Sequence, residues 1–196
     1  MNGMTTEQER IAAIAHHEAG HTVAAWRLRL KFKHVTIRPD TDSLGHMLHS
    51  VPNWFRPDIE SSDRVFLRAQ RHIITSFAGQ LAEAKLRGRP PRFGMESDNQ
   101  NAVDMAFRFC GSRETTEAYL RYCWLMARDL VNERWPQIEA LAAALMERET
   151  LKYEDAIEVI DPGSMALRAT LERTDPVYRA KARAKLAAKP IPKRGK

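Results

Sequence analysis

The chain has 196 residues, 43% of them hydrophobic, and a net charge of +6, which is enough sequence to bury a sizeable core in one domain. It contains no apolar run near the roughly 20 residues needed to cross a bilayer, and the polar segment Met1–Arg10 does not have the pattern of a signal sequence. These features exclude a membrane-spanning class and predict a soluble, cytoplasmic protein. Cys110 and Cys123 lack C-x-x-C spacing, so we expect reduced thiols and not a disulfide or a zinc clasp.

The most informative motif lies near the amino terminus, where residues 17–21 read His-Glu-Ala-Gly-His, the H-E-x-x-H pattern. On a helix, side chains four residues apart lie on one face with Cβ atoms about 5–6 Å apart, so His17 and His21 can reach one metal ion. Glu18 lies on a neighbouring part of the face, where it can act as a general base on water. Since this short pattern also occurs by chance, histidines satisfied within a helical core are the alternative.

The surrounding sequence favours the metal site. Apolar residues recur at helical spacing on both sides of the motif and place the two motif histidines on the inward-facing stripe, where a neutral imidazole needs a partner. A metal ion would supply that partner. His16 is about 100° round the helix from His17, so we interpret it as a flanking residue and not as a ligand.

A small β structure is expected next. Residues 32–38 alternate and are β-branched before Pro39, which predicts a strand, and residues 43–51 predict a second, shorter strand after a turn at 40–42. A spacing of three puts His46 and His49 on opposite faces of such a strand, so neither is expected to bind metal.

Helical periodicity dominates the rest of the chain. We expect a long helix from residue 62 to Gly88, a loop at 89–94, a helix capped by Ser97 that stops at Gly111, and further helices beyond. Pro136 either kinks one rod or starts a new helix at its first turn. The predicted fold is mainly α with a small β-sheet or hairpin, a zinc metallopeptidase domain with H-E-x-x-H on its amino-terminal helix.

A zinc hydrolase needs a third protein ligand, and four carboxylates are available: Glu83, Glu96, Asp98 and Asp104. Glu83 lies mid-helix among small residues, an unusual setting for a charge that calls for a polar partner. Asp98 lies at the start of a helix after a loop, where the helix dipole favours an anion. From the residues alone, Asp98 is only slightly preferred to Glu83.

Several segments also resemble, in order, the protease domain of the FtsH family of membrane-bound AAA+ zinc metalloproteases, over about residues 11–160. The segments and their family counterparts are residues 17–21 (H-E-A-G-H), 34–39 (K-V-T-I-x-P), 44–46 (L-G-Y), 78–83 (G-G-R-x-A-E), 97–102 (N-D-L-x-x-A) and 141–151 (L-A-x-x-L-L-E-x-E-T-L). Only the first motif is specific by itself, and the resemblance depends on the shared order and spacing.

The resemblance implies a site. It implies that His17, His21 and Asp98 bind Zn²⁺ and that Glu18 is the general base, and so raises Asp98 well above Glu83. In the family, the strand that continues into L-G-Y borders the cleft. Residues near Gly45, His46 and Met47 would then contact a substrate that adds to the sheet edge in extended form.

The departures from the family pattern concern the surroundings of this site. The chain has no G-x-x-x-x-G-K-[ST] sequence and no membrane anchor, so we expect a protease domain without its own ATPase. Gln80 replaces an arginine and Ala84 a second acidic residue, which leaves substrate range and oligomer contacts open. Such a domain would cut only peptides, unfolded segments or a dedicated partner.

The carboxyl end has a different composition, so we divide the chain into a metallopeptidase-like domain at 1–160 and a helical extension with a basic tail at 161–196. Residues 179–196 contain eight Lys or Arg and no acid, and since the whole chain carries +6, the residues before the tail carry −2. This tail could contact nucleic acid or an acidic membrane surface, although a solvated terminus is favoured because no aromatic residue interrupts the charges.

The sequence thus predicts a zinc-dependent endopeptidase that hydrolyses unfolded or partner-presented polypeptides. A homo-oligomer and a separate ATPase or adaptor stay open as partners. The alternative is a zinc-containing, non-catalytic protein that binds peptides or partners, although retention of Glu18 argues against it. A third class, an interaction protein acting through its basic tail, would bind nucleic acid in a salt-sensitive way.

Overall fold

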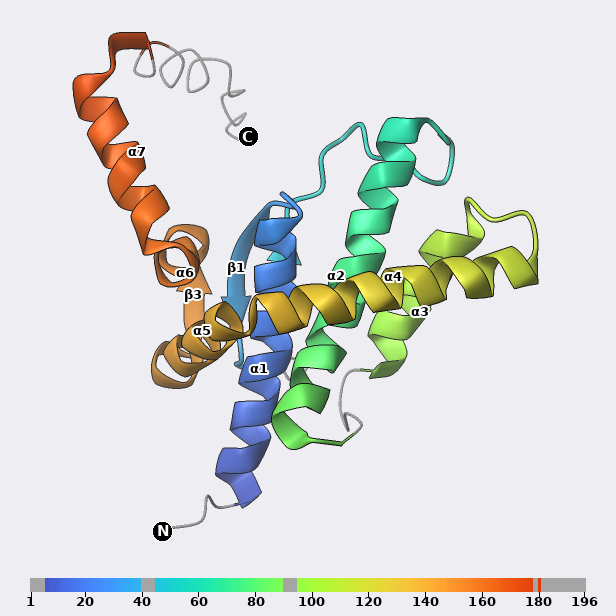
Figure 1. The fold of residues 1–196 in the computed structure, drawn as a ribbon, viewed down its shortest axis with the longest axis horizontal. Coiled ribbons are helices and arrows are strands. Elements are labelled where there is room, and N and C mark those ends of the chain that lie inside the picture. The colour runs from blue at the N-terminus through green and yellow to red at the C-terminus, as the bar shows by residue number, and fades with distance from the viewer. Residues whose placement is uncertain (1–5, 40–44, 90–94, 178–179, 181–196) are drawn as a thin grey trace, which may run out of the picture. The chain divides into compact units, whose positions relative to one another are not determined.

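The structure is a computed structural model and describes residues 6–39, 45–89, 95–177 and 180. These residues are mainly helical with one small sheet, as the sequence predicts (Figure 1). The elements, in chain order, are α1 (Thr6–Arg27), β1 (Phe32–Thr36), β2 (His46–His49), α2 (Asp63–Arg87), α3 (Met95–Phe107), α4 (Arg113–Glu133), α5 (Trp135–Arg148), β3 (Thr150–Lys152), α6 (Tyr153–Ile160) and α7 (Pro162–Thr174). None of the described helices is long and apolar enough to cross a membrane.

The chain forms two compact units, residues 1–160 and residues 161–196. The first contains α1 to α6 and the sheet, and the second contains α7. Most of the basic tail, on which the nucleic-acid and membrane expectations rest, lies outside the described residues.

The first unit is built on the contact between α1 and α2, which lie side by side in Figure 1. Gly20 permits their close approach, since a Cβ there would stand 2.6 Å from the carbonyl oxygen of Ala78. Helix α5 packs against α1, and α4 and α3 pack against α2. The largest fully buried apolar side chains of this core are Val23, Val35, Val65, Ile73, Val131, Ile138, Leu141, Leu145 and Leu151.

The sheet has the strand order β2-β1-β3, with both pairs antiparallel. Val35 in the central strand faces Met47 on one side and Leu151 on the other. Strand β2 therefore has no neighbour on its outer side among the described residues. The turn expected at 40–42 lies outside those residues, and β3 was not expected from the sequence, because its three residues follow directly on a helical pattern.

The helix boundaries test what the sequence predicted for Ser97 and Pro136. Ser97 is the third residue of α3 and not its cap, so that prediction is wrong. Pro136 lies in the first turn of α5, where its missing N–H costs nothing, so it starts a new helix and does not kink a continuous one. Helix α2 ends as expected at Gly88, whose φ of 61° is left-handed.

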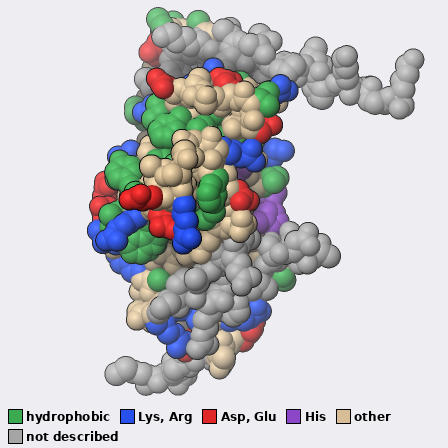
Figure 2. Space-filling model, turned by 90° about the vertical axis from the view of Figure 1, so that its right-hand side faces the viewer, with side chains coloured by type: hydrophobic (Ala, Val, Ile, Leu, Met, Phe, Trp, Pro, Cys, Tyr) green, Lys and Arg blue, Asp and Glu red, His purple; other side chains and the backbone are tan. Residues whose placement is uncertain are grey.

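On the face drawn in Figure 2, basic (blue) and acidic (red) side chains are interspersed, and histidines (purple) reach the surface at one edge.

Candidate metal centre

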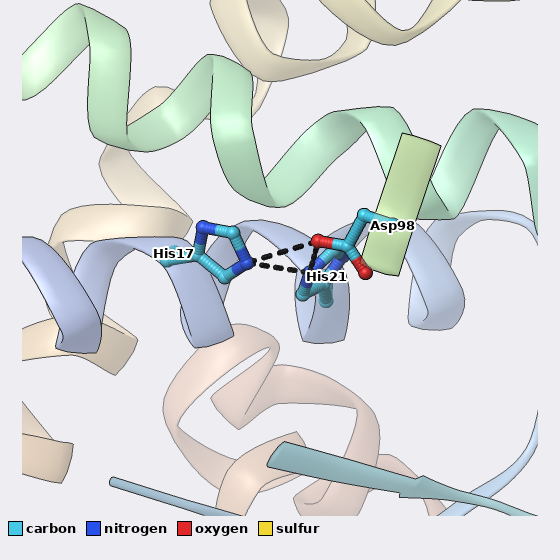
Figure 3. Close-up of side chains that lie close together, drawn as sticks. All are labelled: His17, His21 and Asp98. Carbon is cyan, nitrogen blue, oxygen red and sulfur yellow. Dashed lines mark hydrogen bonds and ion pairs between the residues drawn. The ribbon is translucent and has the colours of Figure 1, made fainter. Parts of the chain in front are cut away.

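The H-E-x-x-H histidines meet an aspartate from a distant part of the chain. His17 and His21 extend from α1, and Asp98 extends toward them from α3 (Figure 3). The Nε2 atoms of the two histidines are 3.0 Å apart, and each is 3.1 Å from Oδ2 of Asp98. This group, largely shielded from solvent, could hold a metal ion.

The spacing of the three atoms fits a small cation. Ligand distances of about 2.0–2.1 Å in a tetrahedral zinc site put neighbouring ligand atoms about 3.3 Å apart. The observed separations of 3.0 and 3.1 Å are close to that edge length. The site therefore needs little rearrangement to accept a metal ion.

The orientation of the His21 ring is fixed by contacts with α2. Its Nδ1–H donates a 2.7 Å hydrogen bond to the backbone carbonyl of Thr75, so the lone pair of the neutral ring is at Nε2, on the side of Asp98. Gly79, one turn further along α2, leaves room for the ring, because a Cβ at that position would overlap the imidazole. The sequence analysis missed both Thr75 and Gly79. A glycine inside a long helix was the available signal for a close contact.

His17 is oriented by a buried carboxylate. Its Nδ1 lies 3.6 Å from Oε2 of Glu83, and the other oxygen of Glu83 forms an ion pair of 3.1 Å with Arg87. The side chain of Glu83 is only 1% exposed, so its charge is stabilised by these neighbours. Glu83 thus lies next to Nδ1 of His17, and Asp98 is the carboxylate in the group that could hold a metal ion.

The other carboxylates considered as ligands do not enter this group. Asp104 is exposed and accepts a 2.7 Å hydrogen bond from Gln100, and the side chain of Glu96 lies outside the described residues. His16 also lies apart, since its Nδ1 donates to the carbonyl of Ala12 and its ring lies 5.7 Å from that of Trp135. This placement agrees with its interpretation as a flanking residue.

The position of Asp98 depends on the contact between α3 and α2. Gln80 on α2 donates a 2.8 Å hydrogen bond to the side-chain oxygen of Asn99, the residue after Asp98. Asp98 is also near the amino-terminal end of α3, where the helix dipole favours a negative charge. Gln80 therefore helps to fix the position of Asp98 in the group that could hold a metal ion.

The three groups strongly affect one another's protonation. Burial disfavours charge on His17, but hydrogen bonds to Asp98 and Glu83 outweigh it and raise the pKa of His17 to about 10. Burial is likewise outweighed at His21, where the charge of Asp98 raises the pKa. At Asp98, burial opposes ionisation, but the charge of His21 and hydrogen bonds to both histidines hold the pKa well below its usual range. A metal ion would replace protons held by this group.

Glu18 is a buried carboxylate beside the three metal-binding residues. It is 5% exposed, and its Oε2 has no hydrogen-bond partner among the described residues. Burial raises its pKa, although the charges of His21 and His17 act in the opposite direction. Burying a carboxylate oxygen without a partner is costly, which indicates a reactant or an ion as the intended partner.

The three residues expected to contact substrate surround the start of β2. Gly45 lies against Glu18, since a Cβ at Gly45 would stand 3.1 Å from Cγ of Glu18 and 2.8 Å from the carbonyl oxygen of Thr36. His46 is half-buried, with its ring 5.5 Å from that of His34. Met47 is 9% exposed and belongs to the core, so its side chain is not available to a substrate.

A scan of protein-family models finds no match to this chain, and a search of curated proteins finds none that is significantly similar.

Proposed function

We propose that this protein is a zinc-dependent endopeptidase that hydrolyses unfolded or partner-presented polypeptides. The observation that carries the proposal is the convergence of His17, His21 and Asp98 within 3.1 Å of one another beside Glu18. This combination, two imidazoles and one carboxylate with a second, buried carboxylate beside them, is typical of hydrolytic zinc sites, in which three protein ligands leave one position open. The order of the FtsH-like segments also supports it.

The donor atoms favour zinc. A set of two imidazole nitrogens and one carboxylate oxygen excludes the all-oxygen sites of Mg²⁺ and Ca²⁺, but non-haem Fe(II) uses the same set. Glu18 favours zinc over iron, because a buried base beside the metal serves hydrolysis. The chemistry that zinc supplies at such a site is Lewis acidity, which polarises a peptide carbonyl and makes water more acidic.

Glu18 supplies the proton transfers. Its carboxylate accepts a proton as water attacks the peptide carbonyl, and then delivers that proton to the amine that leaves. The raised pKa of Glu18 favours the first of these steps, since a stronger base takes the proton more readily. His17 and His21 keep their Nε2 atoms directed at the metal position through Glu83 and Thr75.

The outer edge of β2 is the natural place for a substrate. A polypeptide in extended form would add a strand there through backbone hydrogen bonds, and Gly45 would bring it next to Glu18. A folded protein cannot present such a strand, so the substrate class is an unfolded segment or one held open by a partner. A homo-oligomer or a separate ATPase or adaptor would be the means of presentation.

The test compares the zinc-bound full-length chain with Glu18→Gln, which removes the base without touching the metal-binding atoms. We expect elemental analysis to find one zinc ion in both proteins and only the wild type to cleave casein, an unfolded substrate. Cleavage should fall by at least about 10²-fold in the variant. If both bind zinc and neither cleaves, the protein is a non-catalytic binding protein. Iron in place of zinc would also overturn the proposal.

A further inference from the structure

A second group of chemically active side chains lies beyond the metal centre, where β2 ends. It brings together two histidines, two arginines and two aromatic residues from β2, the loop after it and the first half of α2. We name this group the His49 cluster, and it consists of His49, Trp54, Phe55, Arg64, Arg68 and His72.

The cluster is tightly assembled. The ring of His72 lies 5.1 Å from that of His49, edge to face, and is stacked with that of Phe55 at 5.3 Å. The guanidinium of Arg68 lies 5.4 Å from the ring of Phe55, and that of Arg64 lies 3.6 Å from the ring of Trp54. The aromatic rings therefore hold the two arginines in place through cation–π contacts.

Several nitrogen atoms in the cluster have no hydrogen-bond partner among the described residues, although they are shielded from solvent. These atoms are Nδ1 of His49, Nε of Arg68 and Nε2 of His72. The only hydrogen bond of Arg68 in this part of the chain is a long one of 3.5 Å, from Nη2 to the carbonyl of Ser50. No described carboxylate forms an ion pair with Arg64 or Arg68.

The electrostatics point to a missing negative charge. Burial lowers the pKa of His49 to about 4, and the charges of His21 and Arg68 add to this shift. Burial also lowers the pKa of His72 to about 3, with smaller contributions from His49 and Arg68. Burial, Arg71 and Arg64 also lower the pKa of Arg68. Positive charge is thus disfavoured here by desolvation and repulsion, and an anion would relieve both effects.

The cluster and the catalytic residues lie along the same strand. Gly45 abuts Glu18 and His49 ends β2, so the two sites are separated by four residues, or about 13 Å of extended chain. His72 is one helical turn before Thr75, whose carbonyl holds His21. A polypeptide lying on the outer edge of β2 would therefore reach both sites at once.

Resting on the proposed function, we propose that His49, Arg68 and His72 form a subsite for a carboxylate of the polypeptide substrate, within about four residues of the cleaved bond. The carboxylate comes either from an Asp or Glu side chain or from the carboxyl terminus of the substrate. Arg68 supplies the charge and the two imidazoles supply hydrogen bonds. Single-stranded nucleic acid fits less well, because Arg64 already covers Trp54 and His72 already covers Phe55, so these ring faces are not open to bases.

The test measures binding and does not depend on cleavage. Full-length Glu18→Gln protein is titrated with fluorescent ten-residue peptides that contain at most one carboxylate and no other charge. The first set of peptides has an amidated carboxyl terminus and a single Glu, placed at a different position in each peptide. In the second design the free carboxyl terminus is the only carboxylate. The third is the uncharged reference, with Gln in place of Glu and an amidated carboxyl terminus. We expect one Glu position, or the free terminus, to bind about tenfold more tightly than the uncharged peptide.

The matched variants are Arg68→Gln and Arg71→Gln, each made in the Glu18→Gln protein. Both remove one positive charge from the same helix, but Arg71 is exposed and outside the cluster. Arg68→Gln should reduce the preference for the carboxylate to less than about twofold. Arg71→Gln should change it much less, because Arg71 lies outside the cluster and acts on Arg68 only through its charge. If Arg68→Gln does not fold, His49→Gln takes its place.

The proposal is overturned by a carboxylate preference that Arg68→Gln retains, by the absence of any preference, or by Arg68-dependent binding of oligo(dT) without peptide binding. A carboxylate preference together with a wild type that does not cleave casein would support the subsite and overturn the proposed peptidase function. Cleavage of casein without a carboxylate preference would support the peptidase function and overturn the subsite.

Discussion

Gly79 of α2 lies directly against the imidazole of His21, with no room for a side chain between them. The ring is held between this glycine and the carbonyl of Thr75, which accepts its Nδ1–H at 2.7 Å. The second helix thus fixes the direction in which a residue of the first helix offers its metal-binding nitrogen.

The substitution Gly79→Ala should displace His21 and lower zinc affinity by at least about tenfold, because the orientation of a metal-bound histidine depends on its outer contacts. Alanine is the better helix former by about 1 kcal/mol, so a loss of affinity cannot come from a weakened helix. Competition with a chromophoric chelator measures the affinity. Gly111→Ala, at a position open to solvent, is the control and should bind zinc like the wild type. Equal affinities in the two variants would contradict this account.

The substitution Glu83→Gln should lower zinc affinity about 10- to 100-fold, because it removes the carboxylate that lies 3.6 Å from Nδ1 of His17. It also removes the ion pair between Glu83 and Arg87, so a lower melting temperature is expected in the metal-free protein as well. Glu147→Gln, on the exposed surface, is the matched control. A variant that is less stable but binds zinc with unchanged affinity would show that Glu83 only supports the fold.

The substitution Gly45→Ala should reduce casein cleavage by at least about tenfold while zinc content stays at the wild-type level. The added methyl would press on Cγ of Glu18, at 3.1 Å, and on the carbonyl oxygen of Thr36, at 2.8 Å, and so move the base without touching a metal-binding residue. Elemental analysis and initial rates on the same sample separate the two effects. Full activity in this variant would mean that Glu18 tolerates displacement.

Stability should fall in mild acid because of His49 and His72. An unfolded histidine has a pKa near 6.5, whereas burial lowers the pKa of His49 to about 4 and of His72 to about 3. Between pH 6.5 and 4 the unfolded chain therefore binds protons that the folded protein does not. The free energy of unfolding should drop as the pH falls, by at most about 1.4 kcal/mol per pH unit for each histidine.

The variant His72→Phe should have a flatter pH dependence over this window. Urea unfolding from pH 7 to pH 4.5, with chelator present to remove metal effects, compares it with the wild type. Parallel curves for the two proteins would show that His72 does not titrate differently in the folded and unfolded states.

Much of the helical framework could be predicted because its signals are local. The apolar period and Gly88 locate α2 to within one residue at each end, and Pro136 marks the start of α5. The H-E-x-x-H spacing alone puts two imidazoles on one face. These features follow from contacts between residues that are neighbours in the sequence.

The remainder depends on contacts between distant residues, which one sequence does not reveal. To choose Asp98 over Glu83 as the third ligand, one must know how α3 packs against α2. The Gln80–Asn99 hydrogen bond contributes to that packing. Strand β3 exists because Leu151 pairs with Val35, and three residues are too few for a periodic signal. His49 and His72 are likewise brought together only by the tertiary fold, and neither belongs to a sequence motif that would indicate a site.

The distance along the chain between His17, His21 and Asp98 determines how a bound metal ion would affect the stability of the folded state. Asp98 is 81 residues from His17 and 77 from His21, so an unfolded chain would have to close a long loop to gather all three. A metal ion that binds this group therefore binds the folded form almost alone, and each tenfold rise in free metal above the dissociation constant adds about 1.4 kcal/mol to its stability. The concentration of free metal around the protein would then determine what fraction of the chain is folded, with α3 packed against α2, and how readily the chain is degraded.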